Sequence, residues 1–502
     1  MAKRQRDEEH EDLDSSRRQR RLDANAVTRR PPSKDSEDSE GVPPPSLQPK
    51  SESESKKRLA LPGSQCPYLD TIARQRLDFD FEKCCSVSLL KENVYVCLVC
   101  GKYFQGRGPK THACTHALEE QHSMFMNLKS GKVYCLPDGY EVIDRSLEDI
   151  KQVLNPRFTE EQVKRIDEEG TAWRRSLDGQ HFLPGMVGLN NIKCTDYANV
   201  VVHSLLRVKP FRNFFLRLGS EGSEGGRATT LLLEKFGELC RKMWNPGNFK
   251  GQVSPLEFLL AVQERSKRRF RVDVQSDPVD FLTWLLNTLH FDLTSGKPSK
   301  RKSIVTRCFQ GEITVTKINE AGEDQPAVTT KFLMLGLDLP PTPLFKDAFE
   351  KNIIPQVPLF VLLKKYNGTT ISESIKSGRS KYSVTRLPDH LIVWAKRFTK
   401  NNFFREKNPT IVTFPVKSLD VADNIPLPAA EAARSKYDLV ATGCHVGKPE
   451  SGSYHAILYH FADQEWYQVE DLSVKEVRPE IVAIQEAYFQ IYSKQAKFSN
   501  VN

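Results

Sequence analysis

Two cysteines and three histidines in the first third of the chain have a spacing that could bind a metal ion. Cys97 and Cys100 form a Cys-x-x-Cys pair, and His112, His116 and His122 follow shortly after it. Two thiolates and two imidazoles are a common donor set of a closed, tetrahedral zinc site. The spacing therefore predicts a Cys2His2 zinc site, and it leaves open which two of the three histidines bind the ion.

The distribution of cysteine also favours a metal over disulfides. Seven of the 11 cysteines lie between Cys66 and Cys135. An odd total is typical of metal ligands and free thiols in a reducing compartment. The sequence has no run of 18 apolar residues and no signal-peptide pattern, so we expect a cytosolic or nuclear protein without a membrane span.

Two helices are predicted in the second half of the chain. An apolar run after Asp196 predicts a helix that begins there, where the carboxylate would cap exposed N–H groups. Asp277 and Pro278 have the residue types of an N-cap and a first helical position. The apolar residues that follow have helical spacing, namely Phe281, Leu282, Leu285, Leu286 and Leu289.

Several blocks between about residues 183 and 495 resemble the ubiquitin-specific protease domain. They are Gly188–Asn199, Gln275–Leu282, Leu387–Phe398, Tyr437–Val440, Gly452–Tyr454 and Trp466–Asp471. The resemblance implies an α+β architecture, with a papain-like fold of thumb, palm and fingers. Family members often carry a zinc ribbon in the fingers, but this region has only Cys308, so that zinc is expected to be missing.

The same resemblance implies that the catalytic groups are lost. The positions of nucleophile, base and orienting residue read Asp196, Ser453 and Glu470. A cysteine hydrolase needs a thiolate and a histidine, and loss of the nucleophile alone costs on the order of a millionfold. His455 and Cys194 are nearby substitutes, but we expect both to be structural. An Asp196–Glu470 carboxylate pair and an active deubiquitinase with an unusual nucleophile are the remaining alternatives.

The cysteine-rich segment resembles the UBP-type zinc finger of ubiquitin proteases. That resemblance selects four zinc ligands, which are Cys97, Cys100, His116 and His122. Two further zinc positions of the family read Cys85, Ser88, Gln105 and His112, and Cys66, Tyr68, Cys135 and Asp138. Serine and glutamine are poor zinc ligands. The expectation is therefore one zinc ion, with the remaining cysteines packed as small apolar side chains.

Relatives that read ubiquitin hold its C-terminal carboxylate with an arginine and flanking aromatic rings. Arg107, Tyr95 and Tyr140 could do this here, because an arginine fork suits a carboxylate. The family's pocket tryptophans are absent, and the alternative is that Arg107 packs on Tyr103 or binds another partner.

The predicted organisation has three parts. Residues 1–60 contain 14 Lys/Arg, 13 Asp/Glu and no aromatic residue, which predicts a disordered, charged tail. The zinc finger is expected at 61–158 and the inactive protease-like domain at 183–495. The net charge of +9 is compatible with a ribonucleoprotein environment.

Together these features resemble the spliceosomal, tri-snRNP-associated members of the ubiquitin-specific-protease-like family. That implies a nuclear protein, monomeric outside the particle, that supports tri-snRNP assembly or stability by binding its protein subunits. A ubiquitin-binding adaptor is the main alternative. RNA contact is a further expectation, at the basic loop 297–302 or at the segment Lys396–Arg405, where aromatic and charged residues alternate; both could equally be ordinary solvated segments.

Overall fold

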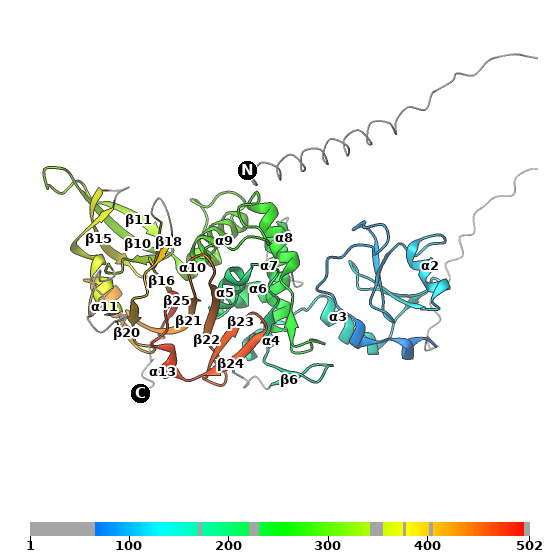
Figure 1. Ribbon diagram of the computed structural model, residues 1–502. Helices are drawn as coiled ribbons and strands as arrows, with labels where there is room; N and C mark the ends of the chain where they lie inside the picture. Colours follow the sequence, from blue (N-terminus) through cyan, green and yellow to red (C-terminus); the bar gives the residue numbers. More distant parts are fainter. Residues whose placement is uncertain are drawn as a thin grey trace, which may run out of the picture. The chain divides into compact units, whose positions relative to one another are not determined.

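The structure is a computed structural model that describes residues 66–168, 173–219, 230–341, 355–374, 378–400 and 405–495. The chain divides into the units Met1–Lys57 and Arg58–Asn502, and every described residue belongs to the second unit. The predicted tail, residues 1–60, lies outside the described residues. No helix in the described ranges is long and apolar enough to span a bilayer. The mixture of helices and strands confirms the α+β class (Figure 1).

The cysteine-rich segment forms a five-stranded antiparallel sheet in the order β2-β1-β3-β4-β5. Its apolar side chains fill a small core, in which Val96 and Met126 pair across two strands and are fully buried. The elements are β1 (Val94–Cys97), β2 (Tyr103–Gln105), α2 (His112–Glu119), β3 (Met124–Asn127), β4 (Val133–Cys135), β5 (Glu141–Val142) and α3 (Glu148–Leu154).

Helices dominate the part of the chain before the large sheet. They are α4 (Glu160–Arg165), α5 (Asp196–Leu205), α6 (Lys209–Arg217), α7 (Leu231–Trp244), α8 (Leu256–Arg265), α9 (Pro278–Leu293) and α10 (Ile304–Phe309). Every residue of α5 is buried, including three consecutive valines. Because valine is a modest helix former, tertiary packing must stabilise this helix.

Helix α9 begins as predicted. The Asp277 side chain accepts hydrogen bonds from the N–H groups of Val279 (2.9 Å) and Asp280 (3.2 Å), and Pro278 is the first helical residue. The five predicted apolar residues of this helix are buried. Capping satisfies N–H groups that have no partner within the helix.

The large sheet has the order β12-β16-β25-β21-β22-β23-β24, and β20 pairs beside β21. Its strands are β12 (Leu335–Leu337), β16 (His390–Ala395), β20 (Leu419–Asp420), β21 (Lys436–Val446), β22 (Ser453–Tyr459), β23 (Trp466–Glu470), β24 (Ser473–Val477) and β25 (Ala487–Lys494). Alternate residues of β22 enter different cores: Ala456 and Leu458 join the cluster that includes α5, and Ile457 joins the cluster on the other side. Both faces of β22 are therefore covered, and α5 packs directly on it (Figure 1).

A second, four-stranded antiparallel sheet has the order β11-β10-β15-β14. Its strands are β10 (Gly311–Ile318), β11 (Val328–Phe332), β14 (Asn367–Ser374) and β15 (Gly378–Arg386). Cys308 is buried in α10, just before β10. The smaller elements are β6 (Arg174–Arg175), β7 (His181–Phe182), β8 (Gly188–Leu189), β9 (Gln252–Val253), β13 (Gln356–Pro358), α11 (Leu359–Leu363), β17 (Phe398–Lys400), β18 (Arg405–Lys407), β19 (Ile411–Thr413), α12 (Ala429–Ala432) and α13 (Pro479–Val482).

Candidate metal centre and degenerate cleft

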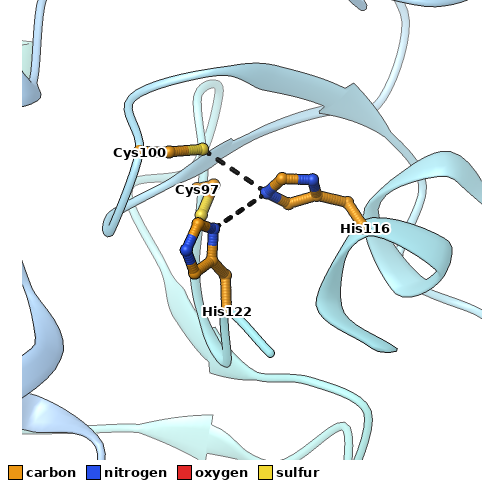
Figure 2. Close-up of side chains that lie close together, drawn as sticks. All are labelled: Cys97, Cys100, His116 and His122. Atoms are coloured by element: carbon orange, nitrogen blue, oxygen red, sulfur yellow. Dashed lines mark hydrogen bonds between the residues drawn. The ribbon is translucent and has the colours of Figure 1, made fainter. Parts of the chain in front are cut away.

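Four side chains of the small domain converge on one point (Figure 2). The donor atoms of Cys97, Cys100, His116 and His122 all lie within 4.8 Å of one another. His116 Nε2 is 3.4 Å from Cys100 Sγ and 3.1 Å from His122 Nδ1. Tetrahedral zinc with bonds of about 2.0–2.3 Å places its ligand atoms roughly 3.4 Å apart, so this donor set fits zinc.

Local backbone geometry brings the two cysteines together. Cys97 ends β1, and the N–H of Gly101 donates to its carbonyl (2.8 Å), which closes a turn around Cys100. Gly101 has φ +78°, and a Cβ there would lie 2.2 Å from the carbonyl oxygen of Arg76. Only glycine fits such a position.

The two histidines come from α2 and from the loop behind it. His116 lies on the helix and its ring stacks on Phe104, with 4.2 Å between centroids. A hydrogen bond with the Cys97 thiol lowers the pKa of Cys100 to about 4, which favours the thiolate form that binds metal. His112, the third histidine, begins α2 and does not belong to the cluster.

At the other two zinc positions of the family, side chains form hydrogen bonds with other protein groups. The Ser88 N–H donates to Cys85 Sγ (3.4 Å), and the Ser88 hydroxyl donates to Gln105 Oε1 (3.2 Å). Cys66 Sγ lies 3.2 Å from the Tyr140 hydroxyl. All 11 cysteines are free thiols, so the chain forms no disulfide framework.

Arg107 lies on an aromatic ring, but not on the predicted one. Its guanidinium is 4.2 Å from the centre of the Tyr134 ring and donates to the Gly139 carbonyl (3.3 Å). The alternative that it packs on Tyr103 is wrong, because the Tyr103 side chain is buried and donates to the Asp78 carbonyl (2.5 Å). Of the predicted flanking rings, Tyr95 is buried and packs edge-on against Tyr134.

Asp196 has a different role from the predicted helix cap. It is the first residue of α5 and is 5% exposed. Its carboxylate accepts hydrogen bonds from Gln275 Nε2 (3.0 and 2.9 Å) and from the backbone N–H of Tyr454 (2.9 Å). Gln275 Nε2 also donates to the Gly452 carbonyl (3.0 Å). The carboxylate thus ties α5 to the segment before α9 and to the start of β22, because donors from both segments meet it there.

The predicted positions near Asp196 differ in their exposure. Ser453 is exposed at the start of β22. His455, two residues on, is buried opposite Cys444, and burial lowers its pKa. The interpretation of His455 as a packed histidine is confirmed. The backbone N–H of Cys194 donates to the carbonyls of Ile192 (3.0 Å) and Val272 (3.2 Å), so it does not point freely into an oxyanion site.

Asp471 is an acidic residue close to the start of α5 to which the sequence reasoning gave no role. Glu470 is exposed at the end of β23, whereas the Asp471 carboxylate accepts from the amides of Asn191 (3.0 Å) and Asn199 (3.4 Å). Burial raises the pKa of Asp471, and the charge of Asp196 acts in the same direction. Gln275 was also missed, although it is the first residue of a block that the sequence singled out.

Two side chains of one predicted RNA segment, Lys396–Arg405, pack against other parts of the protein. Arg397 is fully buried and donates to the carbonyls of Ala487 (2.8 Å) and Thr410 (2.7 Å). Phe398 packs between His445 and Tyr488. Residues 401–404 lie outside the described residues. The alternation of charged and aromatic residues predicted an exposed binding surface, but Arg397 and Phe398 pack within the protein.

Comparisons with known proteins agree with both parts of the fold. The profile described as "Ubiquitin carboxyl-terminal hydrolase" matches residues 187–492, and "Zn-finger in ubiquitin-hydrolases and other protein" matches residues 84–147. The chain is 47% identical to "Ubiquitin carboxyl-terminal hydrolase 39" of Homo sapiens, over 86% of this chain and 80% of that protein. It is 41% identical to "Probable mRNA-splicing protein ubp10" of Schizosaccharomyces pombe, over 86% of this chain and 89% of that protein.

A solved structure has the same architecture. It is described as an essential yeast splicing factor, superposes with a TM-score of 0.70 at 28% identity, and the match covers 86% of this chain and all of that one. The family profile spans more than half of the chain. The chain therefore belongs to the ubiquitin carboxyl-terminal hydrolase family.

Proposed function

We propose that this protein acts in pre-mRNA splicing as a non-catalytic member of its family. The observation that carries the loss of catalysis is the position of Asp196. The family nucleophile is replaced there by a carboxylate, which is buried and fixed by Gln275 and the Tyr454 N–H. A hydrogen-bonded anion at a helix start cannot form a thioester. Ser453 replaces the base and has no imidazole to move a proton.

The splicing role is supported by the relatives. The fission yeast relative is named a probable mRNA-splicing protein, a Saccharomyces cerevisiae relative at 28% identity is named a pre-mRNA-splicing factor, and the matching solved structure is a splicing factor. We infer that the protein works in the nucleus. Its folded surfaces would bind protein subunits of the tri-snRNP and support its assembly or stability, and outside the particle it would be a monomer.

Sedimentation of nuclear extract tests this proposal. Gradient fractions are probed for the protein and for the small nuclear RNAs of the tri-snRNP. Co-migration that survives moderate salt supports a structural partner of the particle. Two results together contradict the proposal: the protein sediments only as a free monomer, and depletion of the protein does not change splicing in the extract.

We propose that the metal centre holds one zinc ion with a structural role. Its four donors close the coordination shell, so bound zinc would fold the finger and not activate water. Metal analysis should give one zinc per chain for the wild type and for Cys84→Ser, whose thiol lies outside the cluster, but none for Cys97→Ser. Equal zinc content in both variants would rule out the assigned ligands.

Ubiquitin binding by the finger is a second candidate function, because Arg107 lies at the surface beside Tyr134. Calorimetry with free ubiquitin decides between an adaptor and a scaffold. Ubiquitin binding by the wild type that disappears in Arg107→Ala would establish that the finger acts as a ubiquitin adaptor. No heat of binding at near-millimolar ubiquitin would exclude the adaptor function.

A further inference from the structure

A groove on the helical part of the protein combines aromatic and cationic side chains. It lies between the end of α8 and one face of α9 and has a volume of about 510 Å³. Its lining includes Arg265, Arg269, Trp284, Asn287, Thr288 and Phe291. The groove is separate from the contacts of Asp196, and nothing in the proposed function uses it.

One aromatic ring of the groove is held in place by its neighbours and the other is partly exposed. Phe291 is 45% exposed, and the Arg265 guanidinium lies over its ring, 5.8 Å from the centre. Trp284 is partly buried, and its ring packs against Phe270 (5.2 Å between centroids) and Phe281 (6.0 Å). A ring fixed by its neighbours loses little conformational entropy when a flat partner stacks on it. Such rings suit a nucleobase better than they suit a small anion.

The chain around the end of α8 is rich in cations, of which Arg265 and Arg269 line the groove together with the carboxylate of Asp280. Five cations occur within seven residues, and all five side chains are exposed: Arg265, Lys267, Arg268, Arg269 and Arg271. Three of them pair with carboxylates: Arg265 with Asp292, Arg269 with Asp280 and Arg271 with Asp273.

The other two cations are available to a ligand. Lys267 and Arg268 have no ion pair within the described ranges. Both have positive φ (52° and 63°), in the turn that leaves α8. They lie in the chain between Arg265 and Arg269, which line the groove, and two exposed cations at that place would attract phosphates.

Polar side chains complete the floor. Asn287 and Thr283 are exposed on the same face of α9, one turn apart. The Asn287 amide donates to the Thr283 carbonyl (2.8 Å), which fixes its orientation. An oriented amide beside stacked rings can bond to the edge of an unpaired base.

We propose that this groove binds a short segment of single-stranded RNA. Bases would stack on Phe291 and the edge of Trp284, and the backbone phosphates would bind Lys267 and Arg268. The combination of rings, amide and cations favours RNA over an acidic peptide, because acidic side chains offer no flat ring that could stack on Phe291 or Trp284. Neither of the segments singled out in the sequence as basic contributes to this lining.

Fluorescence anisotropy with the full chain tests the site. The probe is a fluorescein-labelled, unstructured RNA of about ten nucleotides, a length that one such site can hold. Lys267→Glu/Arg268→Glu should weaken binding at least about tenfold and reduce the slope of log K against log salt by about 1.4, or 0.7 per cation. Phe291→Ala should weaken binding about fivefold or more through lost stacking.

Arg174→Glu/Arg175→Glu is the matched control, because it reverses two adjacent exposed cations elsewhere on the protein. It should bind RNA within about twofold of the wild type. Equal losses in the two double variants would overturn the proposal, since binding would then follow net charge alone. No RNA binding by the wild type, or tighter binding of a polyglutamate peptide that depends on Lys267 and Arg268, would also overturn it. Unchanged melting temperatures of the variants show that folding is not the cause.

Discussion

Replacing Asp196 with alanine should destabilise the protein by about 2–4 kcal/mol, because it removes a buried carboxylate that accepts several hydrogen bonds. The carboxylate accepts hydrogen bonds from Gln275 and from the Tyr454 N–H, and hydrogen bonds to a charged group contribute about 1.5–3 kcal/mol each. Gln275 keeps its bond to the Gly452 carbonyl, but the Tyr454 N–H is left buried without a partner. Relief of the buried charge offsets part of this loss.

The assay is thermal unfolding followed by tryptophan fluorescence. At roughly 2 °C per kcal/mol for a domain of this size, Asp196→Ala should lower Tm by about 4–8 °C. Asp196→Asn keeps one acceptor oxygen, so its Tm should fall by about half as much as that of Asp196→Ala. Asp280→Ala is the control, since Asp280 also lies in the first turn of a helix but is 67% exposed and pairs with an exposed arginine. If Asp196→Ala and Asp280→Ala have the same Tm, the Asp196 carboxylate does not hold α5, the segment before α9 and the start of β22 together.

Two further substitutions probe the metal centre and the interior. Gly101→Ala would place a Cβ 2.2 Å from the Arg76 carbonyl oxygen at φ +78° and should reduce zinc retention in a competition with a chelator, whereas Gly108→Ala, with no atom within 4 Å of its Cβ, should retain zinc like the wild type. Burial lowers the pKa of His203 to about 3, below the unfolded value of about 6.5, so its contribution to stability is complete above pH 6.5 and is lost as the pH falls. At pH 5 the loss is about 2 kcal/mol, so His203→Leu should reduce the difference in unfolding free energy between pH 7 and pH 5 by that amount in urea unfolding at the two pH values, and an unchanged difference would contradict this role of His203.

Local patterns in the sequence predicted much of what is local in the structure. The start of α9 at Pro278, its Asp277 cap and its buried face follow from residue types over a few turns. The Cys-x-x-Cys pair predicted the metal centre, but spacing left three histidines open. The structure resolves this choice because His116 and His122 reach the cysteines and His112 does not.

Contacts between residues far apart in the chain could not be predicted from the sequence. The partners of Asp196 are 79 and 258 residues away along the chain, so a helix cap was the nearest local explanation, and it was wrong. Arg397 belongs to a charged, aromatic-rich segment that predicted a surface, but its three carbonyl partners hold it in the interior. Asp471 and Glu470 are adjacent, and only the end of β23 after Glu470 decides that Asp471 bonds to Asn191 and Asn199 while Glu470 is exposed.

The hydrogen bonds of Asp196 give this position a structural role. In a cysteine hydrolase the first residue of the central helix must remain free to attack a substrate. Here the first residue of α5 is hydrogen-bonded to two other segments and is a fixed part of the framework. A rigid framework suits a protein that binds partners with preformed surfaces.

Hydrolysis of a ubiquitin–fluorophore conjugate tests the central claim most directly. The purified, zinc-loaded protein is compared with buffer, with Asp196→Asn and with Cys194→Ser, which removes a thiol two residues from Asp196 in the chain. The account predicts no release of fluorophore above buffer in any of the three proteins. Turnover by the intact protein that disappears in either variant would contradict it and would identify the residue that performs the chemistry.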